Sequence, residues 1–189
     1  MTHRSEPERR RFLQRAGVAA VSCVAAPALP LLAAPARAAT GRTRALSLLH
    51  THTGERLATT YAVDDRYLQP VLGTLDHFLR DHYNGAVGRM DPQLYDLLHG
   101  LHQRLRAEAP FEIISAYRSP HTNERLRERG GGGVARRSLH MDGRAIDVRL
   151  PGVPLADLRD AAIELRAGGV GYYARERFVH IDTGRVRTW

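Results

Sequence analysis

The chain is 189 residues long, and its 28 basic residues, all arginine, outnumber 20 acidic ones to give a formal net charge of +8. A basic balance of this size is compatible with a polyanionic partner but does not indicate one, and we expect no nucleic-acid partner. The single cysteine, Cys23, excludes an intrachain disulfide and a thiolate cluster. Any transition metal must therefore be held by His, Asp or Glu.

Residues 1–38 have the pattern of a secretory signal. Arg9–Arg11 precede Phe12-Leu13, the apolar stretch 16–36 carries no charge, and Ala36-Arg37-Ala38 resembles a cleavage site. The adjacent arginines favour a twin-arginine signal peptide, which directs export of folded proteins. We therefore expect the twin-arginine export machinery as a partner and a periplasmic or cell-envelope location.

Two alternatives for this segment are weaker. The apolar stretch could remain as a membrane anchor, but Pro27, Pro30 and Pro35 interrupt it, so no stable membrane span is expected after processing. Cys23 could be a lipidation site, but Ala20 is a poor first residue for a lipoprotein cleavage box. Cleavage after residue 38 would leave residues 39–189, enough for one domain with its own core.

The first elements expected in that domain are a hairpin and two helices. Arg44–Leu49 and Arg56–Ala62 are rich in Leu, Thr and Tyr and flank a Thr53-Gly54 turn, which predicts the hairpin. Apolar residues at helical spacing predict a helix over Gln69–Tyr83. A second helix should begin at Asp91-Pro92, a cap followed by proline. Its apolar stripe consists of Leu94, Leu97, Leu98, Leu101 and Leu105.

Short strands and helices alternate in the second half. Phe111–Ala116 is a predicted strand, Ser119-Pro120 opens a helix to about Arg129, and Gly130–Gly133 should be a flexible loop. Apolar and polar residues alternate over 146–150, as in a half-buried strand.

The last predicted elements are a helix and a closing hairpin. The helix begins at Pro154 and stops at Gly168-Gly169, and the hairpin pairs Val170–Tyr173 with Phe178–Asp182. Helices come early and strands late, which predicts an α+β domain with a small antiparallel sheet flanked by helices.

Two of these segments carry candidate metal ligands. On the 146–150 strand, Ile146 should face the core and Asp147 the opposite side, and on the last strand His180 and Asp182 should share a face. His140 lies seven residues before Asp147. Zinc in catalytic sites takes three protein ligands and leaves one position open, so His140, Asp147 and His180 are a plausible ligand set. The neighbouring Ser138 could hydrogen-bond one of these ligands.

The combined pattern is more specific than the spacing alone. The run S-x-H-x-x-G-x-A-x-D from Ser138 to Asp147, followed by the H-x-D of His180–Asp182, resembles the zinc D-alanyl-D-alanine peptidase superfamily, which shares its fold with the Hedgehog signalling domain. With Ser115–Ser119, Arg166–Tyr173 and Phe178–Gly184, the match is greatest to the YcbK-like (MepK) murein endopeptidases. The resemblance covers nearly the whole chain.

This resemblance implies a function and roles for residues. It implies a Hedgehog/D-Ala-D-Ala peptidase-like fold, Zn²⁺ held by His140, Asp147 and His180, and hydrolysis of peptidoglycan stem-peptide cross-links, at diaminopimelate-containing bonds. It also implies that Arg118 contacts the substrate. A fixed guanidinium can pair with a developing oxyanion or a carboxylate, which is consistent with that role.

The position of the expected proton-transfer group departs from the superfamily pattern. Many superfamily members carry an acid three residues before the last histidine ligand, where this chain has Arg177. Glu176 is adjacent, but neighbouring strand residues point to opposite faces. Asp182 shares the face of His180, and we expect it to act either as the general base or as a group that orients a histidine.

The remaining histidines are weaker candidates. His121 follows Arg118 closely and could line the cleft, and the Gly130–Gly133 loop could form a rim beside it. The others are expected to be solvated or packed side chains: His50, His52, His77, His82, His99 and His102.

Two other functions stay open. One is a D-Ala-D-Ala-type carboxypeptidase with the same metal chemistry. The other is a non-catalytic, zinc-stabilised wall-binding module, which the missing upstream acid keeps in consideration.

Overall fold

The structure is a computed structural model that describes residues 42–130 and 134–189. The predicted signal peptide, residues 1–38, lies outside the described residues, as do residues 131–133 of the predicted glycine loop. Within the described residues, no helix has both the length and the apolar character needed to cross a membrane.

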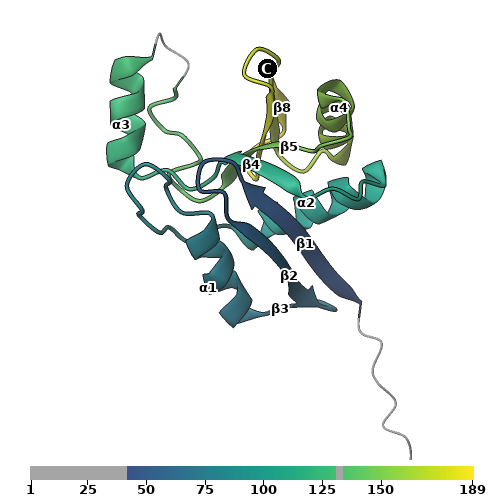
Figure 1. Cartoon of the computed structure of the whole chain (residues 1–189). Coiled ribbons are helices and arrows are strands. Elements are labelled where there is room, and N and C mark those ends of the chain that lie inside the picture. Colours follow the sequence, from purple (N-terminus) through teal and green to yellow (C-terminus); the bar gives the residue numbers. More distant parts are fainter. Residues whose placement is uncertain (1–41, 131–133) are drawn as a thin grey trace, which may run out of the picture. The chain divides into compact units, whose positions relative to one another are not determined.

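An eight-stranded mixed sheet forms the centre of the domain (Figure 1). Its strand order is β3-β2-β1-β4-β5-β7-β6-β8. In chain order the strands are β1 (Thr43–His50), β2 (Arg56–Val63), β3 (Arg66–Tyr67), β4 (Phe111–Ser115), β5 (Ala145–Arg149), β6 (Gly169–Tyr173), β7 (Phe178–Asp182) and β8 (Arg187–Thr188). Neighbours run antiparallel except for two parallel pairs, β1 with β4 and β6 with β8.

The α+β class and both predicted hairpins are confirmed, but the sheet is larger than predicted and mixed rather than antiparallel. Strands β1 and β4 are parallel because the chain between them passes through α1 (Gln69–Phe78) and α2 (Pro92–Leu105) before it returns to the sheet. Parallel neighbours require a crossover of this kind. Strands β3 and β8 have two residues each, too few for alternation to reveal them.

Helices α1, α2 and α4 (Leu155–Leu165) supply the other half of the core. Helix α1 contacts β2, α2 contacts β1 and α4, and α4 contacts β6 and β7. Of the predicted stripe of α2, Leu94, Leu98 and Leu101 have no exposed surface, and Leu97 and Leu105 are partly buried against the core. Burying a leucine side chain contributes about 1.5–3 kcal/mol, so this stripe is a large part of what holds α2 on the sheet.

Helix α1 is shorter than predicted, because it ends at Phe78 rather than Tyr83. The cause lies in Asp81. Its carboxylate accepts hydrogen bonds from the backbone N–H groups of Tyr83 and Ser119 and from the Ser119 hydroxyl. Such side-chain bonds to the backbone compete with the helical ladder. Asp81 is 1% exposed, so these hydrogen bonds are buried. They hold the backbone after Phe78 in a conformation that does not continue the helix.

Strands β5 and β7 carry core side chains on one face and the candidate metal ligands on the other. Ile146, Val148 and Val179 have no exposed surface and lie in the core cluster. Because side chains alternate along a strand, Asp147 and His180 point to the opposite face, as predicted. The polar pair is therefore carried by a sheet that is rigidly packed from behind.

Candidate metal centre

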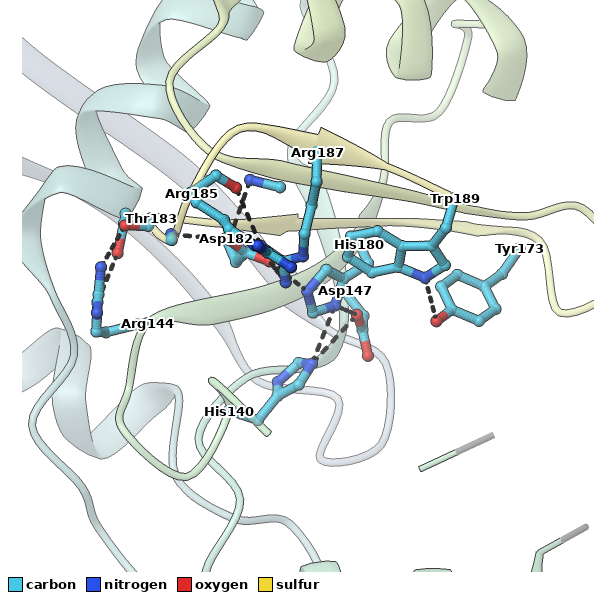
Figure 2. Close-up of polar contacts among 12 residues, drawn as sticks. His140, Arg144, Asp147, Tyr173, His180, Asp182, Thr183, Arg185, Arg187 and Trp189 are labelled. Atoms are coloured by element: carbon cyan, nitrogen blue, oxygen red, sulfur yellow. Dashed lines mark hydrogen bonds and ion pairs between the residues drawn. The ribbon is translucent and has the colours of Figure 1, made fainter. Parts of the chain in front are cut away.

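Three chain segments bring His140, Asp147 and His180 together. Asp147 on β5 and His180 on β7 are direct partners in the antiparallel register, so their side chains leave the sheet side by side. His140 comes from the turn that precedes β5. Figure 2 shows the three side chains converging from these segments.

The turn before β5 is anchored where it bends. Gly143 has φ +66°, a left-handed conformation that favours glycine, and a Cβ there would lie 2.0 Å from the carbonyl oxygen of Arg89. The Gly143 carbonyl accepts a hydrogen bond from the Asp91 N–H, and its own N–H donates to the His140 carbonyl. The turn is thereby fixed against the start of α2, and with it the position of His140.

The donor atoms of the three side chains face one another. His180 Nδ1 lies 2.8 Å from Asp147 Oδ1, and His140 Nε2 lies 3.3 Å from the same oxygen. The two histidine nitrogens are 3.3 Å apart. Within the described residues, this is the one group of three or more His, Cys, Asp or Glu side chains with donor atoms within 4.8 Å of one another.

This arrangement fits a tetrahedral cation. Zinc–nitrogen and zinc–oxygen bonds of 2.0–2.1 Å require neighbouring ligand atoms to be about 3.3 Å apart, close to the spacings seen. The outer nitrogen of each histidine is occupied: His140 Nδ1 lies 2.7 Å from the Ala116 carbonyl, and His180 Nε2 lies 3.2 Å from Asp182 Oδ2. Metal-binding histidines are held in this way, which leaves the inner nitrogens as ligands.

The pKa values of Asp147 and His180 are set by burial and by the charges and hydrogen bonds of their neighbours. Burial alone would raise the pKa of Asp147, but the charges and hydrogen bonds of His140 and His180 hold it well below its ordinary value. Burial lowers the pKa of His180, but hydrogen bonds to Asp147 and Asp182 outweigh it and raise the pKa to about 8. Asp147 therefore carries a negative charge at neutral pH.

Asp182 lies behind His180 rather than beside its inner nitrogen. It has no exposed surface, whereas the ligand cluster opens to a cavity. Its carboxylate accepts hydrogen bonds from the backbone N–H groups of Gly169 and Gly184 and from Arg187. Burial by itself would raise the pKa of Asp182, but these bonds and that from His180 keep it well below its ordinary value.

A cavity of about 310 Å³ lies over the ligand cluster. Arg118 lines it, as do two other arginines, Arg137 and Arg187, whereas Asp147 is its one acidic residue. The remaining lining residues are Val134, Ala135, Ser138, Leu139, His140, Tyr173, Phe178, His180 and Trp189. A cavity lined by three arginines and several apolar side chains suits a ligand that bears negative charge.

Arg118 is fixed through its backbone. Its N–H donates to the His140 carbonyl, and its guanidinium makes only long contacts, 3.4 Å to Asn123 Oδ1 and 3.5 Å to Ser115 Oγ. The adjacent Ser119 caps α3 (Pro120–Arg129) and is held by Asp81. The backbone is therefore rigid beneath a guanidinium that is weakly held by the protein.

Of the other residues singled out from the sequence, only Ser138 lies at the cavity. Glu176 and Arg177 are exposed in the β6–β7 turn, and neither lines the cavity. His121 is exposed on α3 and also lies outside the lining. Ser138 does line the cavity, but within the described residues its hydroxyl makes no hydrogen bond to a ligand.

The C-terminal residues are the part of the site that pattern reasoning missed. Strand β8 runs beside β6 and brings Arg187 and Trp189 to the cavity. The Trp189 ring lies 5.2 Å from the His180 ring, and its Nε1–H donates to the Tyr173 hydroxyl at 2.9 Å. Their signal was an arginine and a tryptophan shortly after the H-x-D motif, which no periodicity distinguishes from a solvated tail.

Three side chains converging on one point, with the remaining position open to a cavity, are the arrangement of catalytic rather than structural metal sites. On an α+β scaffold, this places the protein in the class of candidate metal-dependent hydrolases. Comparison with known families makes the class specific: the family described as peptidoglycan L,D-endopeptidase MepK matches residues 38–189. The chain belongs to this family of peptidases, as its sequence motifs indicated.

Individual relatives match at similar length. The peptidoglycan L,D-endopeptidase MepK of Escherichia coli strain K12 is 40% identical over 185 residues, which cover 97% of this chain and 98% of the relative. The probable peptidoglycan L,D-endopeptidase MepK of Haemophilus influenzae is 36% identical over 186 residues, which cover 97% and 96%.

Proposed function

We propose that this protein is a zinc-dependent peptidoglycan endopeptidase that hydrolyses peptide cross-links of the cell wall. The observation that carries the proposal is the convergence of His140, Asp147 and His180 at the floor of a cavity that Arg118 also lines. The names of the relatives support the substrate, and L,D-bonds between diaminopimelate residues are the bonds that we expect to be cut.

The proposed metal ligands are His140, Asp147 and His180. Bound Zn²⁺ would lower the pKa of a water molecule to about 7 and polarise the scissile carbonyl. Arg118 then faces the same space with a guanidinium that has no carboxylate partner in the described residues. It would hold a substrate carboxylate or the oxyanion that develops during hydrolysis.

Of the two roles considered for Asp182, the geometry favours positioning. Its carboxylate is fully buried and contacts the outer nitrogen of His180, on the side away from Asp147. A general base must reach the reacting water or substrate, whereas a group that orients a ligand needs only this contact.

The finer features of the fold and location belong to the same proposal. We infer that residues 39–189 form a domain of the Hedgehog/D-Ala-D-Ala peptidase type and that residues 1–38 are a twin-arginine signal peptide. The protein would then act in the periplasm or cell envelope, where its substrate lies. A twin-arginine route would allow the metal to be loaded before export.

The decisive experiment is digestion of purified muropeptide dimers. Chelator-treated protein should be inactive, added Zn²⁺ should restore monomer products, and His140→Ala should remain inactive because it lacks one ligand. Products are separated by chromatography and identified by mass. His121→Ala is the matched control, since His121 is exposed outside the cavity, and it should keep full activity.

The same digestion separates the other candidates. Release of free D-alanine without monomers would indicate a carboxypeptidase. Retention of the protein on intact cell wall with no product, even with Zn²⁺ added, would indicate a binding module and refute the enzymatic proposal. Dimers with L,D- and D,D-cross-links, tested side by side, establish which bond is cut.

A further inference from the structure

Arg187 reaches from β8 to the carboxylate behind His180. Its Nη2 lies 2.7 Å from Asp182 Oδ2, and its Nη1 lies 3.1 Å from Asp182 Oδ1 (Figure 2). Two nitrogens on two oxygens form the forked pair that arginine makes with carboxylates and lysine cannot. The pair is two-thirds or more buried on both sides, since the side chains are 33% and 0% exposed.

Both oxygens of the Asp182 carboxylate have hydrogen-bond partners besides Arg187. Oδ1 also accepts hydrogen bonds from Gly169 N–H at 3.0 Å and Gly184 N–H at 2.8 Å, and Oδ2 lies 3.2 Å from His180 Nε2. Arg187 is the one permanently charged donor among these groups. A buried carboxylate without a cation is costly, so removal of Arg187 should change how Asp182 is held.

The backbone leaves space for this pair only because glycine stands at two positions. A Cβ at Gly169 would lie 2.4 Å from Asp182 Oδ2 and 2.5 Å from Arg187 Nη1, and one at Gly184 would lie 2.8 Å from Asp182 Oδ1. The pair is therefore built into the packing around β6 and the chain after β7, unlike a surface ion pair.

Trp189 links the guanidinium to the ligand itself. The Arg187 Cζ lies 4.8 Å from the Trp189 ring centre, within cation–π range, and the same ring lies beside His180. His180 thus contacts Asp182 at one edge, and the tilted Trp189 ring lies with its centre 5.2 Å from that of His180. Arg187 therefore contacts both of these neighbours of His180.

We propose that Arg187 is a positioning residue of the metal centre. Its fork fixes Asp182, Asp182 holds the Nε2–H of His180, and the ring then presents Nδ1 toward His140 and Asp147. The inference rests on the proposed metal site but not on the proposed substrate. Loss of such a partner behind a ligand weakens metal binding about 10- to 100-fold.

The test is the affinity of metal-free protein for Zn²⁺, measured by competition with a chromophoric chelator. Arg187→Met should bind Zn²⁺ about 10- to 100-fold more weakly. Arg187→Lys keeps the charge but not the fork, and should bind more weakly by about 3- to 10-fold. Arg185→Met is the matched control, because it removes an exposed arginine two residues away and should bind like the wild type.

A second readout is the absorption spectrum of the Co²⁺-substituted protein, which reports ligand geometry. Arg187→Met should change its visible bands, whereas Arg185→Met should not. If Arg187→Met does not fold, as judged by circular dichroism, Arg187→Lys decides alone. Wild-type affinity and spectrum in Arg187→Lys would overturn the proposal, because a lysine cannot form the fork.

A double-mutant cycle tests the route through Asp182. In an Asp182→Asn background, Arg187→Met should cost less than about 3-fold in affinity, because the carboxylate that transmits its effect is gone. An equal loss in both backgrounds would refute the route. A wild-type protein that binds no Zn²⁺ would refute the metal site itself, whereas Zn²⁺ binding without hydrolysis would refute only the proposed function.

Discussion

At the scale of single residues, the polar groups around the cavity share one design. Each is held from behind by one contact and leaves another atom toward the cavity. His140 is held by the Ala116 carbonyl, His180 by Asp182, and the backbone of Arg118 by the His140 carbonyl. The two histidine rings and the Arg118 backbone therefore do not have to reorganise when a charged substrate arrives, whereas the Arg118 guanidinium, which makes only long contacts, can turn toward it.

Replacement of Arg118 tests whether its guanidinium acts on the substrate. Arg118→Ala should lower kcat/KM for muropeptide dimers about 10²- to 10³-fold, as loss of a group that stabilises an oxyanion does. Its hydrogen bonds to Asn123 and Ser115 are long, so the melting temperature should barely change. Zn²⁺ affinity should also be unchanged, because no ligand is removed.

The control for this experiment is Arg136→Ala, which removes an exposed arginine outside the cavity lining. It should retain wild-type kinetics. If Arg118→Ala lost Zn²⁺ or unfolded, the arginine would be a structural residue and the proposed role would be wrong.

At the scale of elements, the turn before β5 positions a proposed metal ligand, His140. It lies between two proposed ligands and packs against the start of α2, so its backbone conformation sets where His140 points. Gly143 is the position at which this packing leaves no room, because the Arg89 carbonyl oxygen would be 2.0 Å from a Cβ.

Gly143→Ala should therefore destabilise the protein more than a left-handed φ alone predicts. Gly152 is a matched comparison: its φ is +84° and a Cβ there would have nothing within 4 Å, whereas Gly143 has φ +66° and a backbone clash. We expect about 1 kcal/mol for Gly152→Ala and at least about 3 kcal/mol for Gly143→Ala. Urea unfolding measures both, and equal losses would contradict the account.

A second element-scale feature is a histidine cluster where β1 meets the chain after α1. The His52 and His82 rings stack with centres 4.0 Å apart, and His50 meets His82 edge-on at 5.6 Å. Burial, together with His52 and His50, lowers the pKa of His82 to about 4, and Arg118 acts in the same direction. Asp81 opposes them but does not reverse the shift.

This cluster predicts a loss of stability in acid. His82 stays neutral in the folded chain down to about pH 4 but takes up a proton below about pH 6.5 when the chain unfolds. The unfolded state therefore binds more protons in this window, and the free energy of unfolding falls as the pH drops. His82 should contribute about 1–3 kcal/mol to that fall.

His82→Gln should flatten this pH dependence, because glutamine does not titrate. Urea unfolding at several values between pH 4 and pH 7 measures the effect. His77→Gln, at an exposed position on α1, is the matched control and should leave the wild-type curve unchanged. Parallel curves for His82→Gln and the wild type would show that His82 is not the group responsible.

At the scale of the whole molecule, the proposed ligands come from a turn and two strands that tertiary structure alone brings together. Zn²⁺ bound there would hold the turn to the sheet. A ligand that binds only the folded state stabilises it by about 2.7 kcal/mol at 100 times its dissociation constant.

The melting temperature should accordingly rise with added Zn²⁺. Chelator-treated protein should melt lowest, and each increase in Zn²⁺ should raise the midpoint until the metal itself binds the unfolded chain. His140→Ala should show no such rise, because one ligand is missing. A flat response in the wild type would count against the metal centre independently of any substrate.

Features that depend on neighbours along the chain could be predicted from the amino-acid sequence. Alternation placed Ile146 in the core and Asp147 on the opposite face, and helical spacing located the stripe of α2. Both hairpins followed from pairs of strand-like runs, the first with the Thr53-Gly54 turn between its strands. The spacing of His140, Asp147 and His180 indicated a candidate ligand set, and the combined motif indicated the family. Each of these signals is local or is a pattern shared with relatives.

Features that depend on contacts between residues far apart in the chain required the folded structure. The early end of α1 follows from the contact of Asp81 with Ser119, and the parallel pairing of β1 with β4 follows from a crossover of helices. The place of Arg187 behind Asp182 follows from the pairing of β8 with β6. Side-chain alternation indicates a face but not which atom of a ring lies against which partner, and the chemistry of this site depends on that choice.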